Sequence, residues 1–160
     1  MHKSRIVLAV LFITSLASCQ SATGPTSYSQ SSGDGSIKIT QLEDNKTQIG
    51  ETIYFGVDES GINSKMMSVL DAQVVYLKEN KRQSITVEGH TDEQGTREYN
   101  LGLGAKRSNS VKAYMVSQGL SSSRIDVVTY GKERPVSLCS EEKCWKENRR
   151  AVTVIAGGFN

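Results

Sequence analysis

Hydrophobic positions change their spacing several times along the chain, and the runs of β-branched and aromatic residues predict strands. Residues 52–57 contain Ile53, Tyr54, Phe55 and Val57 between a glycine and an aspartate, and this pattern is typical of a buried strand. Further strands are predicted over residues 84–89, 125–130 and 150–156. Residues 37–50 show no consistent period, so we assign no element there.

Apolar residues at helical spacing predict two long helices between these strands. The apolar side of the first consists of Ile62, Met66, Val69, Leu70, Val74 and Leu77. That of the second consists of Tyr99, Leu103, Val111, Tyr114 and Met115. Thr96 is the expected N-cap of the second helix, and Gly119 is its expected stop. The order β-α-β-α-β-β predicts an α/β sandwich with two main helices on one face of a mixed sheet.

The N-terminal residues have the pattern of an export signal. Lys3 and Arg5 precede a continuous apolar run over residues 6–13, and small residues follow. The run is too short to span a bilayer, because a spanning helix needs about 20 predominantly apolar residues. Residues 1–18 are therefore expected to be a signal peptide.

The residues at the end of this leader predict a lipid anchor. Leu16-Ala17-Ser18-Cys19 resembles the bacterial lipobox, in which the cysteine is lipidated and becomes the first residue of the mature protein. The alternative is an ordinary signal peptide with an incidental cysteine. By analogy with lipoprotein sorting, Gln20 after the lipidated cysteine favours the outer membrane.

The cysteine count supports the same interpretation. Three cysteines are an odd number for an exported chain. Using Cys19 as the anchor leaves Cys139 and Cys144 as a possible pair. In an oxidising compartment we favour a disulfide between them over a soft-metal site.

Composition limits the organisation and the function of the chain. The 160 residues are 37% hydrophobic, which fits one domain with a modest core. Residues 20–36 are rich in Ser, Thr, Gln and Gly, so we expect a flexible tether over residues 19–45 and a folded domain over 46–160. The net charge of +2 falls to zero once Lys3 and Arg5 leave with the leader, which argues against nucleic-acid binding.

Common catalytic and cofactor patterns are not found. His90 is the only histidine outside the leader, so a four-ligand zinc site is difficult to assemble. Gly102 and Gly104 lack the third glycine of a nucleotide loop and lie inside a helical pattern. No nucleophile elbow or Ser-His-Asp arrangement is apparent either, so we expect no catalytic residue, metal or cofactor.

The candidate binding site is a polar cluster over residues 88–96, between the second predicted strand and the second helix. Arg107 lies at the edge of the apolar stripe of that helix, where a desolvated charge needs a partner. In one interpretation, Asp92 or Glu88 pairs with Arg107 and the cluster is structural. In the other, Asp92 and Arg107 present opposite charges to a zwitterionic ligand.

Several segments resemble the peptidoglycan-associated lipoproteins of the OmpA C-terminal-like family. They are residues 85–96, 98–100, 103–104, Arg107, 128–133 and 148–152, and the resemblance runs from about Ile53 to Ile155. It implies a non-catalytic domain that binds the diaminopimelate of the peptidoglycan stem peptide.

The resemblance also implies roles for individual residues. By position, Asp92 would bind the ammonium group of the ligand, and Arg107 its carboxylate. Asp58 matches a further ligand-side position, Leu103 a pocket wall, and Asn100 a polar residue that supports the site.

Partners and location follow from the same resemblance. It implies membership of the Tol–Pal system with TolB as a partner, and a lipid-anchored position at the outer membrane facing the periplasm. Roles in envelope integrity and cell division are implied as well. One alternative is an OmpA-like protein-interaction scaffold with a vestigial wall site. Another is a wall hydrolase that uses Asp92 and Glu88 as acid and base. This alternative is less favoured because the two residues lie close together in the sequence.

Three departures from the family pattern, and one match at Arg149 and Arg150, bear on these expectations. Val57 replaces a phenylalanine, which makes that wall of the site smaller. Lys106 replaces an arginine and is expected to be solvated. Arg149 and Arg150 match the family but are expected to be structural, because they open a strand. The loop between the two later cysteines is not a general feature of the family.

Overall fold

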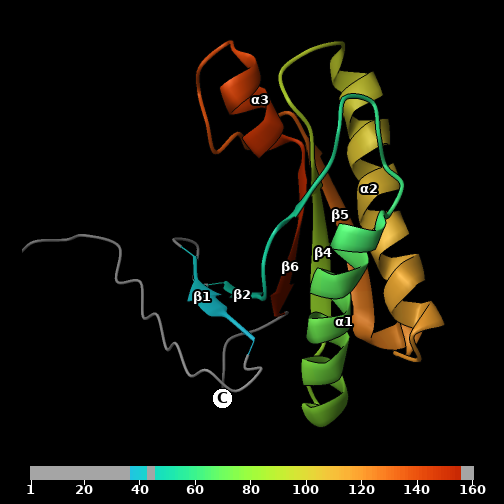
Figure 1. Cartoon of the computed structure of the whole chain (residues 1–160). Helices are drawn as coiled ribbons and strands as arrows, with labels where there is room; N and C mark the ends of the chain where they lie inside the picture. Colours follow the sequence, from blue (N-terminus) through green and yellow to red (C-terminus); the bar gives the residue numbers. More distant parts are fainter. Residues whose placement is uncertain (1–36, 43–45, 156–160) are drawn as a thin grey trace, which may run out of the picture.

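The structure is a computed structural model that describes residues 37–42 and 46–155 (Figure 1). The signal peptide, Cys19 and most of the tether lie outside these residues, so their assignments stay predictions. The elements are β1 (Ile39–Gln41), β2 (Thr47–Ile49), β3 (Ile53–Tyr54), α1 (Ser64–Glu79), β4 (Ile85–His90), α2 (Arg97–Ser117), η1 (Ser122–Arg124), β5 (Ile125–Gly131), α3 (Glu142–Asn148) and β6 (Arg150–Ile155).

All six strands belong to one mixed sheet. The order is β1-β2-β6-β4-β5, and β3 pairs with β6 beside this path. β4 and β5 are parallel, while β6 runs antiparallel to β2, β3 and β4. Because β6 runs against β4, the first residues of β6 lie beside the last residues of β4. This adjacency places the segment before β6 next to the β4–α2 loop.

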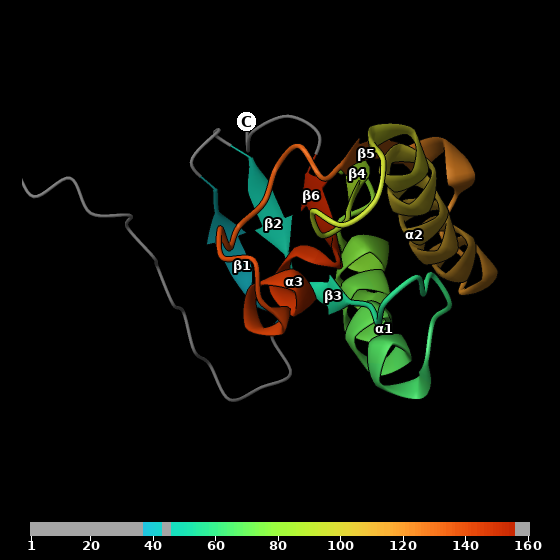
Figure 2. The ribbon, with the colours of Figure 1, turned by 90° about the horizontal axis from the view of Figure 1, so that it is seen from above.

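The predicted α/β sandwich is confirmed. Viewed from above, α1 and α2 lie on the same side of the sheet (Figure 2). The core between them and the sheet is aliphatic, and its fully buried members are Ile49, Leu70, Leu77, Ile85, Val87, Val111, Met115 and Ile125. The sheet and the two helices thus form the rigid support on which the loops are carried.

Capping residues set the ends of the two long helices. The Asn63 side chain accepts a hydrogen bond from the Met66 amide at 3.0 Å at the start of α1. Thr96 caps α2 as predicted, because its hydroxyl oxygen accepts from the Tyr99 amide at 3.2 Å. Gly119 follows the end of α2 with a φ of 94°, a backbone conformation that favours glycine and stops the helix.

Helix α2 lies very close to β4 because two glycines face each other. A Cβ at Gly89 would lie 1.9 Å from the Gly104 carbonyl oxygen. A Cβ at Gly104 would lie 2.4 Å from the hydroxyl oxygen of Thr129 on β5. Gly104 therefore has a packing role, and Arg107 is carried to the carboxyl end of β4 by the same close approach.

Three boundaries differ from the sequence prediction. The strand predicted over 52–57 is reduced to Ile53–Tyr54, because the chain then leaves the sheet toward α1. The segment left unassigned contains β1 and β2, which pair with each other, so the sheet begins before residue 46. The predicted cysteine loop contains the short helix α3.

One residue of the predicted apolar side of α2 lies outside the core, as do Tyr54 and Val57 of the strand predicted as buried, which are 52% and 58% exposed. Tyr99 is 51% exposed, because it lies in the first turn of α2, beyond the end of the sheet. Asn100, the next residue, is buried in its place. The apolar stripe of α2 thus begins one turn later, at Leu103.

The face of β4 that points away from the helices carries a second group of polar side chains. Lys46 donates a hydrogen bond to Glu88, and His90 is almost fully buried beside the Tyr130 ring. The nearest carboxylate oxygen of Glu88 is 3.9 Å from His90 Nε2, beyond hydrogen-bond distance. Neither ring nitrogen of His90 has a hydrogen-bond partner among the described residues.

We expect the free energy of unfolding to decrease as the pH falls below about 6.5, the usual pKa of an unfolded histidine. Burial, which outweighs the attraction of Glu88, lowers the pKa of His90 in the folded chain, and the charges of Arg150 and Arg134 act in the same direction. The unfolded chain therefore binds a proton that the folded chain resists. The loss should not exceed about 1.4 kcal/mol per pH unit.

Urea denaturation at pH 7.5, 6.5 and 5.5 measures this effect. A His90→Gln variant should show almost no change in stability over this range. Glu88 does not contribute there, because its pKa is lowered overall: burial alone would raise it, but His90 and Lys46 outweigh burial. An unchanged pH dependence in the variant would contradict the assignment to His90.

Candidate functional site

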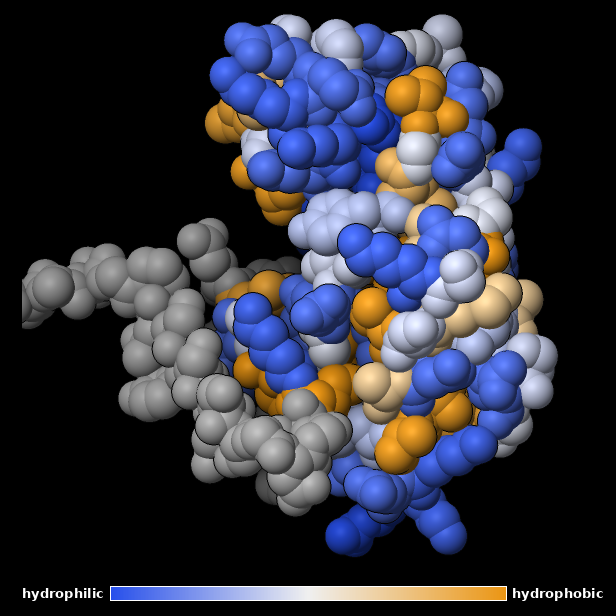
Figure 3. All heavy atoms as spheres, viewed as in Figure 1, coloured by the Kyte–Doolittle hydropathy of each residue, from blue (hydrophilic) through white to orange (hydrophobic). Residues whose placement is uncertain are grey.

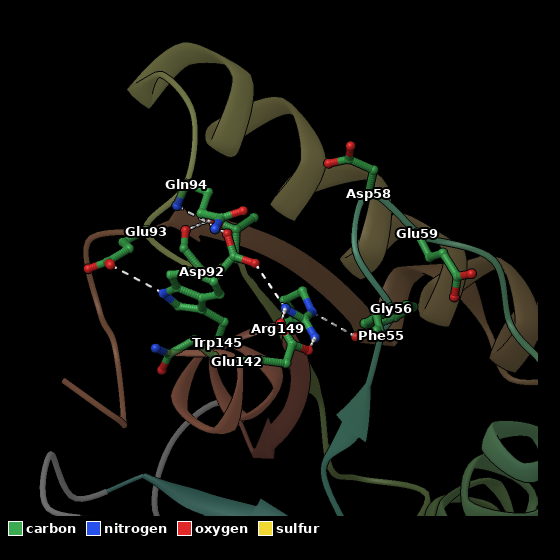
Figure 4. Close-up of polar contacts among 12 residues, drawn as sticks. Phe55, Gly56, Asp58, Glu59, Asp92, Glu93, Gln94, Glu142, Trp145 and Arg149 are labelled. Carbon is green, nitrogen blue, oxygen red and sulfur yellow. Dashed lines mark hydrogen bonds and ion pairs between the residues drawn. The ribbon is translucent and has the colours of Figure 1, made fainter. Parts of the chain in front are cut away.

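The predicted binding residues gather around the carboxyl end of β4 and the beginning of β6. Figure 4 shows two of them, Asp92 and Asp58, with their surroundings. Four segments meet there: the β4–α2 loop, the loop that follows β3, the first three turns of α2 and the junction between α3 and β6. The site is thus built on loops that two neighbouring strands and α2 hold in place.

Asp92 is held in the β4–α2 loop by two hydrogen bonds. One carboxylate oxygen accepts from the Gln94 amide at 3.1 Å, and the other from Arg149 Nη1 at 3.2 Å. Asn100 fixes the same loop by donating to the carbonyl oxygens of Gln94 at 2.7 Å and Thr96 at 3.1 Å. Asp92 is only 7% exposed, so its carboxylate is oriented before any ligand arrives.

Arg107 is completely buried, and main-chain carbonyls bind its guanidinium group. Nε donates to Glu59 at 2.8 Å, Nη1 to His90 at 2.8 Å and Nη2 to Gly56 at 3.0 Å. The expectation that Asp92 or Glu88 pairs directly with Arg107 is wrong, because Asp92 pairs with Arg149 and Glu88 with Lys46. Carbonyl oxygens from three positions replace the expected carboxylate.

The charge of Arg107 is nevertheless maintained. Burial lowers its pKa to about 10; Arg149 acts in the same direction, while Asp92 and Asp58 oppose it. The group thus stays cationic at neutral pH, and the Phe55 ring lies 5.1 Å from the guanidinium carbon. A guanidinium has five N–H donors, so two remain beyond the three that bind carbonyls.

Arg149 belongs to the site as well as to the structure, whereas a structural role alone is what its place before a strand favours. Its Nε donates to the Phe55 carbonyl at 3.2 Å, and Nη1 donates to Asp92. Nη1 and Nη2 also bind the carboxylate of Glu142. Sheet topology is the signal that reveals it, because a residue just before β6 must lie beside the end of β4.

Asp58 and the neighbouring residues form the other side of the site. Asp58 has a φ of 54° and accepts a hydrogen bond from the Tyr99 hydroxyl at 3.0 Å. Leu103 is nearly buried on α2, one turn before Arg107. Val57 is 58% exposed, and Lys106 is exposed as expected.

Helix α3 is attached to the same loop. Cys139 and Cys144 form a disulfide that closes the turn at the beginning of α3. The Trp145 indole N–H donates to the Glu93 carboxylate at 3.2 Å. Hydrogen bonds from Ser140 and Trp145 lower the pKa of Glu93. The turn and the Asp92 loop are therefore connected through side chains on both.

The charges suit a ligand that carries both signs. Asp92 and Asp58 supply carboxylates, and Arg107 and Arg149 supply guanidinium groups. In the part of the chain that the structure describes, no group of three or more metal-binding side chains occurs. No helix there is long and apolar enough to cross a membrane.

Comparisons with known proteins agree with this architecture. Residues 54–150 match the OmpA family. The chain belongs to this family. A peptidoglycan-associated lipoprotein of Mesorhizobium japonicum is 38% identical over 157 residues, which cover 97% of this chain and 94% of the relative. One from Agrobacterium fabrum is 39% identical over 154 residues, covering 94% and 87%.

Solved structures support the same fold. The peptidoglycan-associated lipoprotein from Burkholderia pseudomallei has a TM-score of 0.64 at 36% identity, covering 66% of this chain and 89% of that one. The periplasmic domain of Helicobacter pylori MotB has a TM-score of 0.64 at 17% identity, covering 78% and 83%. At that identity the second likeness concerns the fold alone.

Proposed function

We propose that this member of the OmpA family is a non-catalytic lipoprotein that binds peptidoglycan through the Asp92–Arg107–Arg149 site. The main support is a preoriented carboxylate beside two guanidinium groups, in a chain whose relatives are named peptidoglycan-associated lipoproteins. A diamino acid of the stem peptide carries ammonium and carboxylate groups. Asp92 would bind its ammonium group, and Arg107 would direct positive charge toward its carboxylate.

Attachment through the lipid and through the wall site would join two layers of the cell envelope. Residues 1–18 would be removed on export, Cys19 would carry the lipid in the outer membrane, and the residues between Cys19 and the start of the sheet at β1 would reach toward the wall. Because the two attachments are linked, modest affinity at the wall site still gives firm binding through effective concentration. The Tol–Pal system, with TolB as partner, and a role in envelope integrity and division belong to the same proposal.

Co-sedimentation of the purified full chain with peptidoglycan sacculi tests the wall site. Asp92→Asn removes one charge without changing the size of the side chain, and should weaken binding at least about tenfold. Asp126→Asn is the matched control. Asp126 is exposed at the beginning of β5, away from the carboxyl end of β4 where the site lies, so this variant should bind like the wild type.

The outcomes separate the alternatives. Equal pelleting of all three proteins would show that Asp92 is not in the binding site. Absence of pelleting for the wild type would overturn the wall function and favour the protein-interaction scaffold. For the anchor, Cys19→Ser should move the chain out of the membrane fraction, and retention there would contradict lipidation at Cys19.

A further inference from the structure

Glu142 contacts the site without belonging to the ligand-side positions. It lies within the turn that the Cys139–Cys144 disulfide closes, at the first position of α3. Its carboxylate binds Arg149 through both oxygens, and one of these contacts measures 3.2 Å to Nη1. The same Nη1 donates to Asp92 at 3.2 Å, so Asp92 and Glu142 share one guanidinium group (Figure 4).

This sharing affects the charge that Asp92 can offer. If Arg149 bound Asp92 alone, the pair would be neutral, and an incoming ammonium would compete with a buried guanidinium. Glu142 supplies a second carboxylate, so the group of Asp92, Glu142 and Arg149 carries one net negative charge. Asp92 can then bind a cation while Arg149 stays paired.

The environment of the two partners makes this arrangement asymmetric. The side chain of Arg149 is 5% exposed, whereas that of Glu142 is 61% exposed. Glu142 therefore reaches in from the surface to a buried cation, and the disulfide restricts the turn from which it does so. Arg149 lowers the pKa of Glu142, so the carboxylate stays ionised below its usual range.

We propose that Glu142 is a positioning residue that keeps Asp92 available for the ammonium group of the ligand by sharing Arg149. The inference rests on the proposed wall function. It adds a residue that makes the site prefer a ligand with an ammonium group. Glu142 need not contact the ligand; it acts through the distribution of the Arg149 hydrogen bonds. The disulfide-closed turn is the part of the chain that sets its position.

Two ligands distinguish this role from a merely structural one. Diaminopimelate carries two ammonium groups, and pimelate has the same carboxylates without them. A Glu142→Gln variant of the full chain should bind diaminopimelate about two- to fivefold more weakly, in keeping with an exposed carboxylate. The same variant should bind pimelate as well as or better than the wild type, because one negative charge has been removed.

Glu141→Gln is the matched control. Glu141 lies in the same turn, is exposed and pairs with Lys143 at 2.9 Å rather than with Arg149. Dissociation constants from NMR titrations at pH 7 should be unchanged in this variant. The effect of Glu142→Gln should also decrease at high salt, because charges at the surface are screened.

The results separate this inference from the function on which it rests. Equal affinity of Glu142→Gln and wild type for diaminopimelate would overturn the role of Glu142 and leave the wall function intact. Equal weakening for both ligands would overturn it too, since it would indicate a distorted site. A wild type that binds neither sacculi nor diaminopimelate would overturn both proposals.

Discussion

An Arg107→Met variant is expected to lose about 3–5 kcal/mol of unfolding free energy, a large part of the total stability of an ordinary domain. The guanidinium is buried and donates to the carbonyl oxygens of Gly56, Glu59 and His90. Methionine fills much of the same volume but donates nothing, so the carbonyls of Glu59 and His90 lose the guanidinium, and that of Gly56 keeps only the Glu59 amide at 3.3 Å. Each carbonyl left unpaired in the interior costs about 1–3 kcal/mol.

Urea denaturation of the variant measures this loss. Lys106→Met is the control, because Lys106 is the preceding residue on α2 and is exposed; its stability should change by less than about 0.5 kcal/mol. The unfolding free energy of Arg107→Lys should lie between those of Arg107→Met and Lys106→Met. An ammonium keeps the charge but cannot reach three carbonyls as a planar guanidinium does. Wild-type stability in Arg107→Met would contradict the structural role.

This result would also decide how binding experiments are interpreted. Arg107 joins α2, the end of β4 and the loop after β3, so its removal disturbs three of the four segments that form the site. A loss of wall binding in an Arg107 variant would therefore not separate a ligand contact from a damaged site. Asp92 is the cleaner position, because its two hydrogen bonds lie within one loop and to one arginine.

The sequence was sufficient for the central strands and the long helices because their apolar stripes are long and regular. β1 and β2 have three residues each and are largely polar, so their pairing depends on contact with β6 rather than on local pattern. α3 has seven residues and one buried side chain, Asn148. Short elements of this kind are stabilised by tertiary contacts, which a periodicity analysis does not detect.

The same reasoning explains which site residues were found. Asp92 and Arg107 are recognisable in the sequence because one is a charged residue just after a predicted strand and the other is a charged residue at the edge of an apolar helix stripe. The partner of Arg107 could not be inferred, since carbonyl oxygens occur at every residue and have no sequence signal. Arg149 was assigned to structure because its contact with Asp92 appears only once β6 is known to run beside β4.

Replacing Gly89 by alanine should be the most damaging change in the sheet, at about 3 kcal/mol or more. The new Cβ would lie 1.9 Å from the Gly104 carbonyl oxygen and 2.7 Å from its carbonyl carbon. These are main-chain atoms of α2, so the clash is relieved only if the helix moves away from β4. Such a movement would also withdraw Arg107 from the carbonyl of His90.

Gly102→Ala provides the opposite expectation within the same helix. A Cβ at Gly102 has no neighbour within 4 Å, so alanine should stabilise α2 by about 0.5–1 kcal/mol through its higher helix propensity. Thermal unfolding followed by circular dichroism measures both effects. The midpoint of Gly89→Ala should lie roughly 10 °C below that of the wild type, and the midpoint of Gly102→Ala slightly above it. Equal midpoints would mean that the approach of α2 to β4 tolerates a methyl group. The position of Arg107 would then have to depend on its carbonyl partners alone.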